Sequence, residues 1–285
     1  MTEQKDPFVL SCIDGSRYSG AVCDYAAWIA NRTGAPLKLL HNIERVSTPA
    51  VADLTGSIGL GSQEELLEEL TALEQKRSKL QLEQGRLMLE DARARALAGG
   101  VERVVTCQRH GAVTESLVEL EDHIRVLVLG IRGEEHEDSD RGLGAHLETV
   151  VRSLHKPILV VNREFKAPRS IMLAYDGSEA ARKALDMVAT SAVFKEVECH
   201  LVYVGDGADS VLAEGAEALS HGGISVISAN LQGKTVEALI AYQQKHDIDL
   251  TVMGAFSHSK LRDLLLGSIT AKMLQGTKQP LLLLR

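Results

Sequence analysis

The segment Ile171-Met-Leu-Ala-Tyr-Asp-Gly-Ser178 decides the fold, because it repeats the earlier segment Leu10-Ser-Cys-Ile-Asp-Gly-Ser16. In each copy a short apolar run ends at an aspartate, Asp14 or Asp176, and a Gly-Ser pair follows. A short apolar run bounded by turn residues is typical of a buried strand that leads into a turn. The chain therefore contains two copies of a unit that begins with such a strand.

The rest of the unit is repeated as well. The paired segments are Leu37–Ile43 with Cys199–Val204, Gly111–Leu117 with Gly233–Leu239, Val126–Gly130 with Leu250–Gly254, and Lys156–Val160 with Gln279–Leu283. Strand-like runs alternate with helical patterns, which favours right-handed crossovers and a parallel sheet covered on both faces. We predict an α/β protein with two Rossmann-like domains, each a five-stranded parallel sheet with helices on both faces.

The two copies differ in length between their second and third strands. Asp14 and Asp176 lie 162 residues apart, whereas Gly130 and Gly254 lie 124 apart, so the second copy is 38 residues shorter there. At this place the first copy has a long charged helical tract, at about residues 62–99. We predict a first domain over residues 1–163, which includes this helical insert, and a second domain over residues 168–285.

The long tract carries leucines at heptad spacing. They are Leu66, Leu73, Leu80 and Leu87, and the companion column of a coiled coil would be Leu70, Arg77, Gln84 and Asp91. Because the companion column is mostly polar, it gives little support to a dimeric coiled coil. We predict instead that the leucine stripe packs on the sheet, as the apolar face of an amphipathic helix does.

The composition argues against several classes of partner. The chain of 285 residues is 45% hydrophobic and 25% charged, as globular proteins in water are. Its formal net charge of -8 argues against nucleic acid, since phosphate backbones are bound by clustered Lys and Arg. No apolar run reaches the roughly 20 residues of a membrane-spanning helix, so we expect no membrane partner. Residues 1–7 lack the pattern of a secretory signal.

The cysteines indicate a reducing compartment. They are Cys12, Cys23, Cys107 and Cys199, each in or beside an apolar segment and none in a CxxC pair. Cysteines of this kind behave as small apolar residues, which favours a cytoplasmic protein without disulfides. Cys107, His110 and His123 could in principle ligate zinc, but histidines are scattered elsewhere too, and we predict no metal site.

Segment 254–270 is the most specific functional signal. Gly254 ends a strand at the carboxyl edge of the predicted sheet, and Gly267-Ser268 opens a helix. Backbone N–H groups at a helix start stabilise an anion, and a serine hydroxyl adds a donor. Asp14 and Asp176 fall at the same kind of edge, where open α/β sheets bind ligands. Each aspartate is interpreted either as a cap of the next helix or as a ligand-binding group.

This segment resembles the nucleotide motif of the universal stress protein family, which is Gly, two residues, Gly, nine residues, and Gly-Ser/Thr. The chain has Gly254, two residues, Ser257, nine residues, and Gly267-Ser268, so only the second glycine is replaced. Members of the family have one such domain or two in tandem, and many bind ATP or AMP. The resemblance covers nearly the whole chain outside the long helical tract. It implies a tandem protein with domains of the adenine-nucleotide alpha-hydrolase type.

The resemblance also implies roles for residues of the second copy. Asp176 would meet the adenine or ribose side and Val204 the adenine, while segment 254–270 would hold the ribose and phosphates. Ser257 puts a side chain where the family's glycine allows close approach of the backbone. The implied nucleotide-binding residues are Ala174, Asp176, Val204, Met253, Gly254, Ser257, His258, Gly267, Ser268, Ile269 and Thr270.

The first copy departs further from the motif. It has Gly130, two residues, Gly133, ten residues, and Gly144-Ala145, so an alanine stands where the hydroxyl should be. Segment 134–140 carries five carboxylates, whose charge disfavours an approaching phosphate. Asn42 stands in the place of Val204. We therefore predict one nucleotide site per chain, in the second copy.

The resemblance implies stress-response regulation through an adenine nucleotide, ATP or AMP, with Mg²⁺ as a candidate companion of ATP. No nucleophile with a paired base is readable, so we expect a binding protein, or at most a slow ATPase. A nucleotide-independent interaction or scaffold protein of the same fold stays open as the alternative. By the same resemblance the fifth strands, Pro157–Val161 and Pro280–Arg285, would pair across a pseudo-twofold axis. The molecule would then be a homodimer or a pseudo-dimeric monomer, and no protein partner is indicated.

Overall fold

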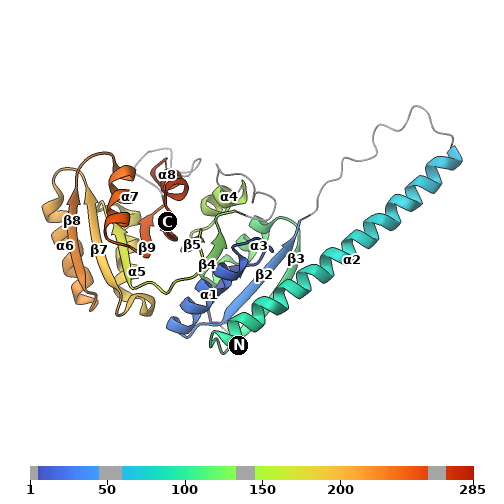
Figure 1. The fold of residues 1–285 in the computed structure, drawn as a ribbon, viewed down its shortest axis with the longest axis horizontal. Coiled ribbons are helices and arrows are strands. Elements are labelled where there is room, and N and C mark those ends of the chain that lie inside the picture. Colours follow the sequence, from blue (N-terminus) through green and yellow to red (C-terminus); the bar gives the residue numbers. More distant parts are fainter. Residues whose placement is uncertain (1–5, 45–59, 133–144, 256–267) are drawn as a thin grey trace.

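The computed structural model describes residues 6–44, 60–132, 145–255 and 268–285 (Figure 1). The first half of the chain contains β1 (Phe8–Cys12), α1 (Ser19–Thr33), β2 (Leu37–Ile43), α2 (Leu60–Ala98), β3 (Val104–His110), α3 (Val113–Leu120), β4 (Ile124–Gly130), α4 (Ala145–Ser153) and β5 (Ile158–Val161). The second half contains β6 (Ser170–Ala174), α5 (Glu179–Thr190), β7 (Glu198–Val204), α6 (Ala208–His221), β8 (Val226–Leu231), α7 (Thr235–Lys245), β9 (Leu250–Gly254), α8 (Ser268–Gly276) and β10 (Leu281–Leu284). Short 3-10 helices at Glu121–His123 and Ala192–Phe194 complete the described elements.

The strands form one ten-stranded sheet in the order β3-β2-β1-β4-β5-β10-β9-β6-β7-β8. Neighbouring strands within each half are parallel, and the halves meet where β5 pairs with β10 in the antiparallel direction. Leu281 lies opposite Val160 in this pairing, and Leu283 lies opposite Ile158. The predicted fold class is confirmed, and so is the pairing of the fifth strands. The two five-stranded sheets are continuous with each other through that pairing.

Helices cover both faces of the sheet. One core cluster joins the strands to α1, α5, α6 and the C-terminal part of α2, through side chains such as Val22, Leu185 and Leu89. The other cluster joins the strands to α3, α4, α7 and α8. Successive residues of a strand alternate between the clusters, with Val9 in the first and Leu10 in the second, because strand side chains point to opposite faces. Burial on both faces explains why the strands read as continuous apolar runs.

The C-terminal part of α2 packs against β2, β3 and α1, mostly through small residues. Gly85, Leu89, Ala92 and Ala96 are buried there. A Cβ atom at position 85 would lie 2.4 Å from the Cδ2 atom of His41, so only glycine fits without moving the imidazole ring. Small side chains on this face allow the helix to approach the sheet closely.

Three of the four heptad leucines of α2 lie outside this contact, and the side chain of Leu66 is not among those that the structure describes. Leu73 is 58% exposed, Leu80 63% and Leu87 49%. In Figure 1 the N-terminal part of α2 extends away from the rest of the chain. The prediction that the leucine stripe packs on the sheet is therefore wrong. Heptad spacing determines which side chains share a face of the helix, but the small residues at 85, 92 and 96 determine which face meets the sheet.

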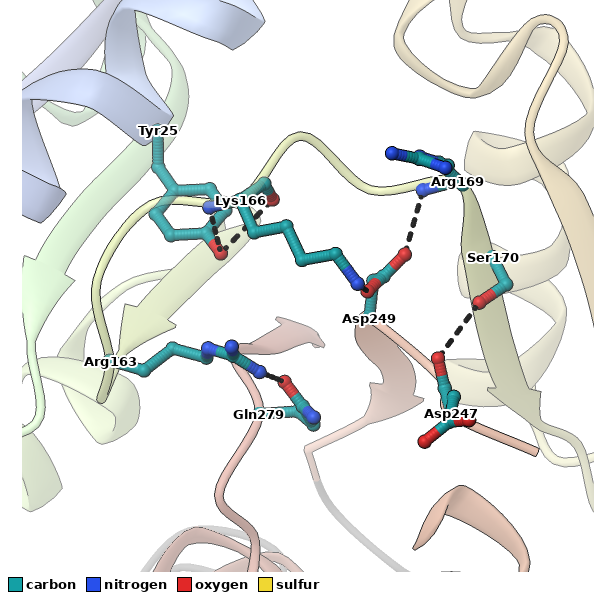
Figure 2. Close-up of polar contacts among 8 residues, drawn as sticks. All are labelled: Tyr25, Arg163, Lys166, Arg169, Ser170, Asp247, Asp249 and Gln279. Atoms are coloured by element: carbon teal, nitrogen blue, oxygen red, sulfur yellow. Dashed lines mark hydrogen bonds and ion pairs between the residues drawn. The ribbon is translucent and has the colours of Figure 1, made fainter. Parts of the chain in front are cut away.

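The segment between β5 and β6 is tied to both halves (Figure 2). Lys166 donates through Nζ to Asp249 Oδ1, and the backbone N–H of Arg169 donates to Asp249 Oδ2 at 2.9 Å. On the other side, the Tyr25 hydroxyl of α1 lies 3.4 Å from both the backbone N and the backbone O of Lys166. Asp249 precedes β9, so these bonds connect α1 to the second half through the linker.

The carboxylate of Asp249 is held in its charged form. Burial raises its pKa, but the hydrogen bonds from Lys166 and Arg169 and the charge of Lys166 outweigh burial, so the pKa lies below its usual value. Since the folded-state pKa is the lower one, ionised Asp249 stabilises the fold above its ordinary pKa. That stabilisation is lost as pH falls through the folded-state pKa.

Leu89 and Leu97 form a matched pair that tests the packing of α2. Leu89→Ala removes a side chain that is only 4% exposed and should lower the free energy of unfolding by about 2–5 kcal/mol, because a core cavity remains. Leu97→Ala removes a side chain that is 40% exposed and should change it by less than about 0.5 kcal/mol. Urea unfolding measures both, and equal losses would contradict the observed orientation of the helix.

Asp249→Asn should lower the free energy of unfolding by about 1.5–3 kcal/mol at neutral pH, because two hydrogen bonds to a charged group are weakened. The difference from the parent should shrink as pH falls below about 4, the ordinary pKa of an aspartate. Urea unfolding between neutral pH and pH values near that pKa measures it. Asp247→Asn, at an exposed neighbour, is the control and should show no such pH dependence. A difference that stays constant with pH would refute this role of the carboxylate.

Candidate functional site

The strand order creates a switch point in the second half. β6 lies between β7 and β9, so the chain leaves β6 toward one side of the sheet and later returns on the other. Open α/β sheets bind ligands outside the carboxyl ends of the strands at such a point. β6, β7 and β9 end there at Ala174, Val204 and Gly254, and Ala174 lies level with Met253. Four of the predicted site residues therefore lie at the carboxyl edge of the sheet: Ala174, Val204, Met253 and Gly254.

Asp176 and Ser178 make different hydrogen bonds at the start of α5. The Ser178 hydroxyl accepts from the backbone N–H of Ala181 at 3.2 Å, which makes this buried serine the helix cap. Asp176 Oδ1 accepts from the backbone N–H of Ser178 at 2.9 Å, and its residue is exposed at the sheet edge. The capping role that the sequence left open for Asp176 therefore belongs to Ser178.

Gly254 has a packing role of its own. A Cβ atom at this position would lie 2.7 Å from the Cβ atom of Ala180 and 3.2 Å from the backbone N of Ala181. The first turn of α5 therefore sits directly against the end of β9. Glycine is required here by the contact between helix and strand, whether or not a ligand also approaches the backbone.

The start of α8 presents a serine to solvent at the same edge. Ser268 is the first residue of the helix and is exposed, and Ile269 is half-buried. The buried Thr270 hydroxyl donates to the backbone carbonyl of Ala255 at 2.7 Å, which ties α8 to the chain just after β9. The proton of the Thr270 hydroxyl is therefore already donated within the protein. The predicted site residues Ser257, His258 and Gly267 lie outside the described residues.

At the corresponding edge of the first half an aromatic side chain packs on the glycine that ends the strand. Gly130 ends β4 as Gly254 ends β9, and a Cβ atom there would lie 3.2 Å from Tyr18 Cβ and 3.8 Å from Tyr18 Cδ2. The 162-residue offset between the copies aligns Tyr18 with Ala180. A tyrosine ring thus packs where the second half has a methyl group. Neither residue stood out in the sequence, although comparing the two copies at this offset would have revealed the difference.

Asp14 and Asn42 at the first edge also make hydrogen bonds within the protein. Asp14 Oδ1 accepts from the Ser19 hydroxyl at 2.8 Å and from the backbone N–H of Ser16 at 3.0 Å. The second half has Ala181 in the place of Ser19, so the hydroxyl bond is specific to the first copy. Asn42 donates through Nδ2 to the Ser116 hydroxyl at 2.8 Å and to the carbonyl of Gly111 at 3.2 Å.

The described residues offer few groups for nucleophilic or metal chemistry. All four cysteines are free, and burial raises the pKa of Cys12 and Cys199 to about 12 and that of Cys23 to about 11. A buried thiol of this kind stays protonated and inert. Within the same residues no three His, Cys, Asp or Glu side chains gather as metal ligands would. None of the helices in the described ranges has the length and apolarity that crossing a membrane requires.

Comparisons with known proteins agree on one family. The model of the universal stress protein family matches residues 9–162 and 206–285. A universal stress protein of Synechocystis sp. is 35% identical over 284 residues, a match that covers 97% of this chain and 99% of that protein.

Solved structures resemble the fold over nearly its whole length. A universal stress protein from Archaeoglobus fulgidus superimposes with a TM-score of 0.74 at 16% identity, and the match covers 99% of both chains. A functionally unknown protein from Pseudomonas aeruginosa superimposes with a TM-score of 0.61 at 15% identity, over 99% of this chain and 93% of that one. At sequence identities of 16% and 15%, these likenesses show a shared fold.

Gly254→Ala tests the packing role of the glycine without any ligand. The added methyl group would overlap Ala180, so the free energy of unfolding should fall by about 1–3 kcal/mol. Ala180→Gly in the same chain removes the nearest atom and should restore part of the loss. Thermal or urea unfolding of the single and double variants measures this. A Gly254→Ala protein as stable as its parent would show that the strand and helix do not meet this closely.

Proposed function

The chain belongs to the universal stress protein family, and from that premise we propose a stress-response regulatory protein that binds an adenine nucleotide in its second half. The proposed domains are residues 1–163 and 168–285, and the proposed location is the cytoplasm. ATP and AMP are the proposed ligands, with Mg²⁺ accompanying ATP. We infer binding rather than rapid turnover as the main activity.

The contrast between the two carboxyl edges carries this proposal. Both edges lie at the same place in a repeated fold, yet Tyr18 packs on Gly130 where the second half has only Ala180. The second edge also has an exposed serine at the start of a nine-residue helix, where free backbone N–H groups and the helix dipole favour an anion. The described ends of the sequence motif, Gly254–Ala255 and Ser268–Thr270, lie at this edge.

We assign roles to the site residues according to their position. Val204 and Ala174 would form the apolar wall for the adenine, with Asp176 on the adenine or ribose side. Ser268 and the first N–H groups of α8 would bind phosphate, together with Gly267. Thr270 would act by holding α8 on the chain after β9, since its hydroxyl proton is already donated to Ala255.

A nucleotide-independent scaffold protein is the second candidate. The first half supports it, because Tyr18 packs on Gly130 at its edge, and Asp14 and Asn42 make hydrogen bonds within the protein. Ser257, in place of the family's glycine, supports it as well. The two candidates differ in a single measurable property, which is whether the purified chain binds ATP or AMP at all.

Calorimetric titration with ATP and with AMP should give one site per chain. Asp176→Ala should weaken binding, whereas the matched change Asp14→Ala in the first half should leave the affinity and the stoichiometry unchanged. Two equal sites would contradict the assignment to the second half. Absence of binding by the parent chain would leave the scaffold candidate.

Within the same titration, Ser268→Ala should weaken binding about tenfold to hundredfold, because a hydrogen bond to a charged group worth about 1.5–3 kcal/mol is lost. Ser220→Ala is the control, since Ser220 is also an exposed serine but lies at the C-terminal end of α6. Gly267→Val should weaken binding further, and Ser257→Gly should tighten it. A Ser268→Ala chain that binds as well as its parent would overturn the phosphate-binding role of α8.

A further inference from the structure

The last strand of the second half leaves one edge of the sheet open. Among the described strands β8 pairs with β7 alone, so it ends the ten-stranded sheet on that side. In Figure 1 it lies toward the end of the molecule opposite the N-terminal part of α2. Ile227, Ser228 and Asn230 are exposed, and the exposed fraction of Ile227 is 43%. The edge of β8 is therefore accessible to another molecule.

Alternate residues of β8 point their backbone groups away from the sheet. The backbone N–H of Cys199 donates to the carbonyl of Ser225 at 2.9 Å, and that of Gly205 donates to the carbonyl of Leu231 at 2.9 Å. Odd-numbered residues of the strand therefore face β7, since the direction of the backbone groups alternates along a strand. The even-numbered residues point their N–H and C=O groups outward, and these are Val226, Ser228 and Asn230.

β8 lacks the features that commonly protect an edge strand. Segment 224–232 contains no charged residue and no proline, and the register of β8 with β7 runs without a bulge. Charged side chains, prolines and bulges at an edge discourage pairing with another chain. An open, neutral edge of this kind is a template on which a further strand can pair.

The opposite edge of the sheet, at β3, carries charged groups and contacts a helix. Arg109 of β3 pairs with Glu119 of α3, and the strand ends at His110. Gln108 donates to the backbone carbonyl of Leu82 at 3.2 Å, which ties this edge strand to α2. The two free edges of the sheet therefore differ, and β8 is the one suited to pairing.

We propose that β8 pairs with β8 of a second copy of the chain in the antiparallel direction. In the parallel pair of β7 with β8, Cys199 lies opposite Val226 but bonds to Ser225. A parallel pair thus sets a residue that faces its neighbour opposite one that faces away. Two identical strands related by a twofold axis cannot meet this condition, because each residue lies opposite its own copy. Identical edges therefore pair about a twofold axis only in the antiparallel direction.

One antiparallel register pairs every outward residue of the strand with another outward residue. It places Ser228 opposite Ser228 of the second copy, and it places Val226 opposite Asn230 on both sides of the twofold axis. Residues opposite each other in this way can exchange both of their backbone hydrogen bonds. The same register sets the exposed Ile227 opposite the small Ala229 of the second copy, so the pairing also covers apolar surface. A second copy supplies this pattern by itself.

The contact between the two strands brings no charged side chains opposite each other, because segment 224–232 is neutral. Charged side chains that flank the strand have partners in their own chain. Lys234 Nζ lies 3.1 Å from Glu237 Oε1, and Glu198 Oε1 lies 3.1 Å from His200 Nε2. The strands can therefore pair without placing like charges in contact along their length.

Pairing through β8 stops at two copies. A twofold contact uses the same edge of each copy, so the only sheet edges left among the described strands of the dimer are those at β3. These edges carry Arg109 and are tied to α2 through Gln108. The assembly is therefore a closed dimer and not an open chain of copies.

Sedimentation velocity of the full chain over a concentration series tests the pairing. The parent should become a dimer as its concentration rises, whereas Ser228→Pro should stay a monomer because the outward N–H group at the twofold axis is lost. Edge strands tolerate proline where the N–H faces solvent, so the melting temperature of this variant should stay close to that of the monomeric parent. Ile227→Lys, a second variant, should weaken the dimer by about tenfold or more, because it places a charge at the neutral contact.

Thr106→Pro and Val105→Lys are the matched controls at the other edge of the sheet. At the 122-residue offset of this part of the repeat, Thr106 aligns with Ser228 and Val105 aligns with Ile227. Both residues are exposed on β3, Val105 at 53%. Both control variants should form the dimer as the parent does.

A cysteine at the twofold axis tests the register. In an antiparallel pair, residues that exchange both hydrogen bonds have Cα atoms about 5.5 Å apart, which is within the range that a disulfide spans. Ser228→Cys should therefore form a disulfide-linked dimer under mild oxidation. Asn230→Cys is the control, because its two copies would lie more than about 10 Å apart along the strands and should not be linked.

Several results would overturn the proposal. One is a parent that stays monomeric up to its highest soluble concentration, and another is an Ile227→Lys or Ser228→Pro chain that dimerises as the parent does. Loss of the dimer in Thr106→Pro would place the contact at β3 instead. A Ser228→Cys chain that forms linked dimers no faster than Asn230→Cys would refute the antiparallel register.

Discussion

The antiparallel pairing of β5 with β10 is the contact on which the rest of the architecture depends. Each strand has four residues, all buried, and each closes one half of the sheet. An unpaired apolar strand at a sheet edge would expose backbone donors and acceptors and invite aggregation. Because β5 and β10 form backbone hydrogen bonds with each other within one chain, the halves form a single ten-stranded sheet. The linker contacts with Tyr25 and Asp249 then hold the connection between β5 and β6 against both halves.

Duplication within one chain allows the two copies to diverge. Both retain the strands, crossovers and terminal glycine that the fold requires, so their sheets look alike. Their carboxyl edges differ through side-chain size, since Tyr18 in one copy corresponds to Ala180 in the other. The proposed nucleotide site in the second half and a different edge in the first are compatible with one fold, because the fold fixes the position of the edge but not the residues at it.

The long helix α2 is a feature of the first half that the second half lacks at this length. α2 is held to the sheet by a face of small residues, and this leaves a column of leucines on another face.

The sequence by itself determined the strand and helix order, the repeat, and the carboxyl edge at which Ala174, Val204 and Gly254 meet. It could do so because parallel strands buried on both faces need continuous apolar runs, and because a repeat of that pattern fixes equivalent positions. Only the tertiary structure decided which face of α2 meets the sheet, that Ser178 rather than Asp176 caps α5, and that Thr270 bonds to Ala255. These outcomes depend on distances between residues far apart in the chain. Spacing along one helix or strand does not contain those distances, so the leucine stripe predicted to be buried is instead exposed.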